Sequence, residues 1–223
     1  MKNPMIYLLK QAQNPRGWFG RWMLSGMNRG HATLTEWGLK HISIEKDFTI
    51  LDVGCGGGKT VQKLALLAPD GRVFGIDNSG KSVQVSKKIN HQLIQEGRVE
   101  IRHSSVSQLP FSDNTFNLVT AVETHYFWPN PINDMHEILR VLKPGGNLLI
   151  IGEVYKGGNY EMKNPKFLKM ATRGEVNMTC PGVEDFDAMF AQAEYTNVSV
   201  FEEIGKKYIC AKGDKRGLIK NYL

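Results

Sequence analysis

The chain has 223 residues, of which 41% are hydrophobic, and a formal net charge of +6. This size suits one large α/β domain, or one domain with an added lid. No apolar run approaches the length of a membrane span, and the N-terminus lacks the pattern of a secretion signal. Cys55, Cys180 and Cys210 lie far apart, without a C-x-x-C pair. We therefore expect a reduced, cytoplasmic protein with no disulfide framework, no metal ligand set and no membrane partner.

The positive charge is mild and its lysines are scattered, except near the C-terminal stretch KKYICAKGDKR. A solvated surface explains such a distribution, while an anionic partner remains the alternative. We therefore do not expect a nucleic-acid partner.

Residues 1–45 form the first segment that stands apart from the rest of the chain. Trp18 and Trp22, and likewise Phe19, Met23 and Met27, have the spacing of a helix with a broad apolar face. We interpret residues 1–45 as an N-terminal helical extension or lid.

From residue 46 onward, strand and helix patterns alternate. Expected strands are TILDV, RVFGID, VEIRH, FNLVTAV and NLLIIGEV, with helices after the first two and over PINDMHEILRVLKPGG. Repeated strand–helix units predict a parallel sheet with helices on both faces. A lysine- and glycine-rich insertion at about 155–180 is expected to lie over the carboxyl ends of the strands, where such sheets bind ligands. After it, a last helix precedes two strands that flank Gly205. The predicted fold class is a doubly wound, Rossmann-like α/β sheet of seven strands, mostly parallel and ending in an antiparallel hairpin, over residues 46–223.

The stretch ILDVGCGGGKT at 50–60 places four glycines where the first strand meets the first helix. Glycine permits positive φ and removes the Cβ, so a ligand can lie against the backbone beside the helix N-terminus. The dinucleotide fingerprint G-x-G-x-x-G fails because Lys59 holds its third glycine position. The phosphate-binding P-loop also fails, since Val53 stands where its first glycine is needed.

Asp77 ends the second strand, about 20 residues beyond the glycine turn, where a carboxylate can accept both hydroxyls of a ribose. The alternative is a cap for the following helix, which Asn78 or Ser79 can supply equally well. We favour ribose binding because of the turn that precedes Asp77.

Four stretches in order, LDVGCGGG, GID, LPFSDNTFNLVTAVE and LRVLKPGG, resemble the motifs of class I S-adenosylmethionine-dependent methyltransferases, in particular their type 11 small-molecule branch. The segment MNRGHATLTEWGL resembles the N-terminal extension of an uncharacterised bacterial subgroup. The resemblance implies S-adenosyl-L-methionine as cofactor and S-adenosyl-L-homocysteine as product.

The resemblance also implies roles for single residues. Those facing the methionine half of the cofactor would be Asp52, Gly54, Gly56 and Gly58. Asp77 would bind the ribose, with Asn78 beside the adenine. Where the family often has an acid that contacts the adenine amino group, this chain has Ser105, and the amide of Val106 is a second candidate for the ring.

The stretch AVETHYFWPN follows the fourth strand, at the expected switch point of the sheet. Glu123 is a candidate catalytic contact, or alternatively a structural acid, and His125 is a candidate general base or a packing histidine. Tyr126, Phe127 and Trp128 can stack on an acceptor or pack against the next helix. The candidate substrate contacts are thus Tyr126, Trp128 and, from the extension, His31.

These observations favour methyl transfer to a small-molecule acceptor. The alternatives are an RNA or other nucleic-acid methyltransferase and a cofactor-binding module without catalysis. The Pro-Pro-aromatic motif of amino-methylating DNA enzymes is absent after Glu123. A NAD-dependent oxidoreductase fits least, because the third glycine and a Tyr-x-x-x-Lys motif are missing.

Overall fold

The computed structural model describes residues 4–15, 17, 31–158, 176, 178–206 and 208–217. The predicted helical stripe from Trp18 to Met27 lies outside the described residues, as does most of the insertion at 155–180. No described helix has the length and apolarity that crossing a membrane requires.

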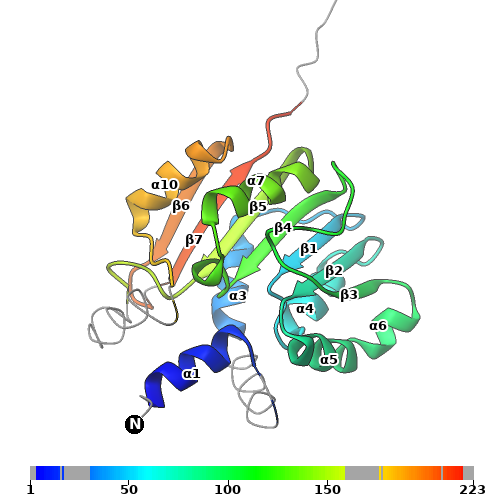
Figure 1. Cartoon of the computed structure of the whole chain (residues 1–223). Coiled ribbons are helices and arrows are strands. Elements are labelled where there is room, and N and C mark those ends of the chain that lie inside the picture. Colours follow the sequence, from blue (N-terminus) through cyan, green and yellow to red (C-terminus); the bar gives the residue numbers. More distant parts are fainter. Residues whose placement is uncertain are drawn as a thin grey trace, which may run out of the picture.

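A seven-stranded sheet in the order β3-β2-β1-β4-β5-β7-β6 forms the centre of the molecule (Figure 1). Its parallel strands are β1 (Thr49–Val53), β2 (Arg72–Asp77), β3 (Val99–His103), β4 (Phe116–Val122) and β5 (Leu142–Gly152). β7 (Tyr208–Asp214) runs antiparallel to both β5 and β6 (Thr196–Glu203). The predicted fold class and terminal hairpin are confirmed.

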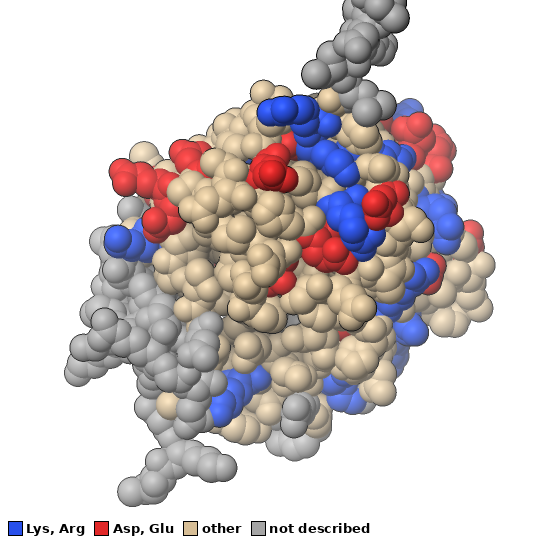
Figure 2. All heavy atoms as spheres, turned by 45° about the horizontal axis from the view of Figure 1, so that its top comes forward, with Lys and Arg blue, Asp and Glu red and all other residues tan. Residues whose placement is uncertain are grey.

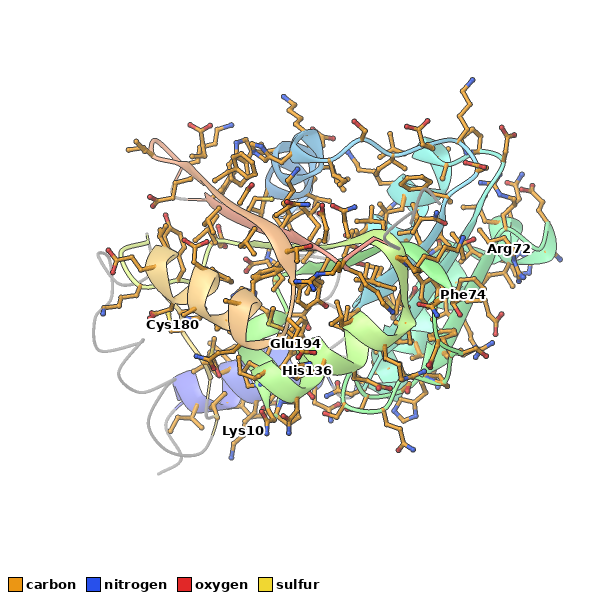
Figure 3. The ribbon with its side chains drawn as sticks, turned by 90° about the horizontal axis from the view of Figure 1, so that it is seen from above. Lys10, Arg72, Phe74, His136, Cys180 and Glu194 are labelled. Atoms are coloured by element: carbon orange, nitrogen blue, oxygen red, sulfur yellow. The ribbon has the colours of Figure 1, made fainter. Side chains whose placement is uncertain are left out.

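Helices cover both faces of the sheet because the central strands are apolar on both sides. One core contains Met135 and Ile138 of α7 (Pro131–Val141) with Phe186 and Phe190 of α10 (Val183–Gln192). The other core receives residues from α3 (Ala32–Gly38), α4 (Lys59–Leu67) and α5 (Gly80–Ile89). In the view from above, α7 and α10 lie on the opposite side of the sheet from α3 (Figure 3).

Two helix boundaries differ from the predictions. The single helix expected after the second strand is divided into α5 and α6 (His91–Gln95). At the break, the buried Asn90 side chain donates to the carbonyl oxygens of Gly58 and Ser86, both at 3.0 Å. The helix expected to include Pro144 and Gly145 ends at Val141, because pairing with β4 begins at Leu142.

The described part of the N-terminal extension contains α1 (Pro4–Gln13), α3 and the 3₁₀ turn η1 (Leu39–His41). Leu34 of α3 is fully enclosed, and a Cβ at Gly38 would lie 2.4 Å from Cδ1 of Ile151 on β5. α3 therefore packs tightly against the sheet. A second 3₁₀ turn, η2 (His125–Phe127), follows β4.

Candidate active site

A cavity of about 530 Å³ lies beyond the carboxyl ends of β1, β2 and β4. Its wall includes the glycine turn after β1, residues after β2 and β4, and residues of α1 and α3. β1 stands between β2 and β4 in the sheet, which is the switch point where open α/β sheets bind ligands. The cavity therefore occupies the position that the sequence predicted for a site.

The glycine turn follows the first strand with three left-handed residues, since φ is +72° at Gly54, +51° at Gly56 and +82° at Gly58. A Cβ at Gly54 would lie 2.2 Å from Oγ1 of Thr124, and one at Gly58 would lie 2.3 Å from Oγ of Ser86. Both the conformation and the space therefore require glycine at these two positions. α4 begins directly after the turn and directs its N-terminus toward the cavity wall.

Asp77 connects the end of β2 to the glycine turn. Its Oδ2 accepts a hydrogen bond from the Gly56 amide and its Oδ1 accepts one from the Ser79 amide, both at 2.8 Å. The helix cap is Ser79, whose Oγ accepts from the Ser82 amide at 3.4 Å. Burial raises the pKa of Asp77, and these amide hydrogen bonds oppose the shift. Each carboxylate oxygen retains a lone pair that a ligand hydroxyl can use.

Asp52 is buried at the other side of the turn, on β1. Its Oδ1 accepts a hydrogen bond from Oγ1 of Thr120 on the neighbouring β4, at 2.7 Å. Burial raises the pKa of Asp52 to about 7, the Thr120 hydrogen bond opposes this shift, and the charge of Asp77 adds to it.

In the absence of ligand, we expect the Asp52→Asn variant to have a larger free energy of unfolding than the wild-type protein above pH 7. Below about pH 4 the two proteins should have the same free energy of unfolding. Between pH 4 and 7 the folded state retains a proton that the unfolded chain has lost, so wild-type stability falls as pH rises. Melting temperatures of both proteins across this range test the expectation. If the melting temperatures of the two proteins change in parallel with pH, Asp52 does not titrate in this range.

The other predicted cofactor contacts also reach the cavity wall. Asn78, Ser105 and Val106 line it, and only Val106 of the three is buried. Oγ of Ser105 accepts from the Ser107 amide at 3.2 Å. His103, at the end of β3, places Nε2 2.9 Å from the Asn78 carbonyl oxygen.

The N-terminal extension forms part of the same wall. Ala12, Gln13 and Pro15 line the cavity, and the Pro15 carbonyl oxygen accepts a hydrogen bond from Oγ of Ser79 at 3.0 Å. Among the described residues of the insertion at 155–180, none lines the cavity. Of the two predicted covering segments, the described structure brings the extension to the site.

Glu123 is the first residue after β4, and its φ is +56°. This left-handed conformation is uncommon and strained for a residue other than glycine. The side chain lines the cavity but is only 7% exposed. Oε2 accepts from the Tyr126 hydroxyl at 2.9 Å, and Oε1 from the Glu153 amide at 2.5 Å. Burial, followed by the charge of Glu153, raises the pKa of Glu123 to about 8. A strained, buried acid on a cavity wall is typical of a functional position.

His125 does not reach the cavity. Its imidazole is buried beside the rings of Tyr126 and Phe186, at centroid distances of 5.0 and 5.5 Å. Neither ring nitrogen has a hydrogen-bond partner among the described residues, and burial lowers the pKa to about 3. This position corrects the prediction of a general base, because a neutral, enclosed imidazole cannot contact an acceptor in the cavity.

Tyr126, a candidate substrate contact, does not line the cavity either. Its side chain is buried outside the cavity wall, and its hydroxyl donates to Glu123. Tyr126 therefore contacts the acid and does not border the cavity, where an acceptor was expected.

Trp128 and His31, the other two candidate substrate contacts, line the cavity. Trp128 is buried, and its indole nitrogen has no hydrogen-bond partner among the described residues. Nε2 of His31 lies 4.0 Å from Oε2 of Glu123, and burial lowers the pKa of this histidine.

Several residues of the wall were not predicted. They include Thr35 of α3, Lys59 and Lys63 of α4, and Thr124 after β4. Thr124 follows Glu123 directly, so the end of β4 was a usable signal for it. The residues of α1 and α3 gave no comparable signal, because their approach depends on tertiary packing.

A family model described as a methyltransferase domain matches residues 51–150. A demethylmenaquinone methyltransferase of Anoxybacillus flavithermus is 30% identical over 183 residues, which cover 73% of this chain and 76% of that protein. Cycloartenol-C-24-methyltransferase 1 of Oryza sativa is 33% identical over 104 residues, so the match covers 47% of this chain and only 30% of that protein's length. The crystal structure of a SAM-dependent methyltransferase from Aquifex aeolicus superposes with a TM-score of 0.66 at 21% identity, covering 86% of this chain and 96% of that one.

Proposed function

Because this chain belongs to the class I S-adenosylmethionine-dependent methyltransferases, we propose that it transfers a methyl group from S-adenosylmethionine to a small-molecule acceptor. The main support for this proposal is the hydrogen bond that the Gly56 amide donates to the Asp77 carboxylate. This hydrogen bond connects the glycine turn to the acid proposed to bind the ribose, and both line the same cavity as Glu123.

The described residues fit the cofactor. The left-handed glycines leave the wall free of side chains where the methionine half would lie, and a Cβ at Gly54 would collide with Thr124. Asp77 has acceptor capacity left for the ribose hydroxyls, and Asp52 is an acid for the ammonium group. When bound, the cofactor supplies a methyl group on a cationic sulfur, and the protein orients the acceptor and excludes water.

The acceptor end of the cavity combines one buried acid with aromatic walls. Glu123, Phe127, Trp128 and His31 border this part of the cavity. Such a pocket suits a small molecule with an apolar body and at least one polar group. The names of the two curated relatives, a demethylmenaquinone and a cycloartenol methyltransferase, support a small acceptor of this kind.

A nucleic-acid acceptor is the weaker candidate. Figure 2 shows basic and acidic side chains interspersed on the face in view. Nucleic-acid binding instead favours a continuous basic surface, because each phosphate contact gains from a lysine or arginine.

The test is incubation of the purified protein with methyl-labelled S-adenosylmethionine and, in parallel, a small-molecule extract or total RNA. We expect label in the small-molecule fraction, lost in Asp77→Ala and kept in Asp187→Ala, a matched change at an exposed position of α10. Label in RNA would favour the alternative acceptor. Cofactor binding without transfer to either fraction would favour a binding module.

A further inference from the structure

Three side chains from separate segments meet at the end of the cavity nearest β4 and β5. His31 precedes α3, Glu123 follows β4, and Glu153 follows β5. One ligand atom from each of these residues lies within 4.8 Å of those of the other two. His31 and Glu123 also line the cavity, so this cluster faces the space proposed for the acceptor.

The central acid of the cluster is held in place. Glu123 is only 7% exposed and has the strained φ of +56°. The Tyr126 hydroxyl and the Glu153 amide fix its two oxygens. Metal-binding carboxylates are commonly oriented by such outer hydrogen bonds. The charge of Glu153 disfavours a negative charge on Glu123, and a cation between the two side chains would reverse that effect.

We propose that His31, Glu123 and Glu153 bind one divalent transition-metal ion. Ligands at about 2.2 Å from one ion lie about 3.6 Å apart in tetrahedral geometry, so the longest separation in the cluster, at most 4.8 Å, must shorten by about 1 Å. An imidazole with two carboxylates favours ions such as Zn²⁺ or Mn²⁺ over Mg²⁺ or Ca²⁺, which prefer oxygen ligands only. The sequence predicted no metal ligands because the three residues lie in distant segments.

The cluster also defines the class of acceptor, and this step rests on the proposed function. Three protein ligands leave at least one coordination position, which is the arrangement of catalytic rather than structural metal sites. Because the cluster borders the cavity, an ion there would bind an oxygen of the acceptor. We therefore infer an acceptor that carries a hydroxyl, carboxyl or keto oxygen.

The test is calorimetric titration of the full chain, without a histidine tag and after treatment with a chelator, using ZnCl₂, MnCl₂ and MgCl₂. We expect one Zn²⁺ or Mn²⁺ per chain and much weaker Mg²⁺ binding. Glu123→Gln and His31→Ala should each weaken Zn²⁺ binding by at least about tenfold, and Tyr126→Phe by about tenfold through the lost outer hydrogen bond. His91→Ala and Glu184→Gln, at exposed positions of α6 and α10, should leave binding unchanged.

Absence of Zn²⁺ and Mn²⁺ binding, or equal Zn²⁺ binding in Glu123→Gln, His31→Ala and wild type, would overturn the metal site. Glu123→Gln preserves the shape of the side chain, and a melting curve checks that each variant is folded. Titration of the same samples with S-adenosylmethionine separates the two proposals. If the protein gives heat of binding with S-adenosylmethionine but not with the metal ions, only the metal site is contradicted. If it gives heat of binding with the metal ions but not with S-adenosylmethionine, only the proposed function is contradicted.

Discussion

Asp77→Ala should weaken S-adenosylmethionine binding by about 100-fold. The variant loses the carboxylate that would accept the ribose hydroxyls, and a hydrogen bond to a charged group contributes about 1.5–3 kcal/mol. It also leaves the Gly56 and Ser79 amides without their acceptor. At a cofactor concentration of about 100 times the wild-type Kd, ligand stabilisation falls from about 2.7 to about 0.4 kcal/mol. The melting-temperature rise with cofactor should therefore nearly vanish.

Two variants make this result specific. Asp77→Asn retains an oxygen that can accept from one of the two amides, so its affinity should be intermediate. Asp187→Ala removes an exposed acid outside the cavity, so S-adenosylmethionine should raise the melting temperature of this variant as much as that of the wild-type protein. An undiminished rise in a well-folded Asp77→Ala protein would rule out ribose binding at this position.

Gly54→Ala should cost both stability and cofactor affinity. The new Cβ would lie 2.2 Å from Oγ1 and 2.7 Å from Cβ of Thr124, at a residue whose φ is +72°. The left-handed conformation alone costs a non-glycine residue about 1–2 kcal/mol. We expect a melting temperature lower by several degrees and cofactor affinity lower by at least about tenfold, because the turn must move.

The matched control is Gly80→Ala, where a Cβ meets no atom within 4 Å and φ is not positive. Addition of Thr124→Ala to Gly54→Ala removes Oγ1 but not the Cβ, so only part of the loss should be recovered. If Gly54→Ala binds cofactor like the control, the close approach at the turn is not a requirement for binding.

The fold was predictable because its signals are local. The apolar runs, the glycines after Val53 and the acid at the end of β2 can each be identified within a stretch of a few residues. Boundaries were less accurate where distant contacts decide them. Asn90 divides a helix by bonding to Gly58, and pairing with β4 ends α7 before Pro144.

The acceptor end of the site was less predictable for the same reason. The residues after β4 were identified as a group, but the sequence does not show which side chains turn toward the cavity. η2 directs Trp128 and Phe127 to the wall and encloses His125 and Tyr126. The approach of α1 to Ser79 through Pro15 bridges 64 positions of sequence and leaves no local pattern.

The most direct measurement is a calorimetric titration of the wild-type protein with S-adenosylmethionine, S-adenosylhomocysteine and NAD in turn. The cavity between the glycine turn and Asp77 predicts saturable binding of the first two at one molecule per chain, and no heat with NAD. Folded protein that gives no heat with either adenosyl compound would contradict the assignment of this cavity.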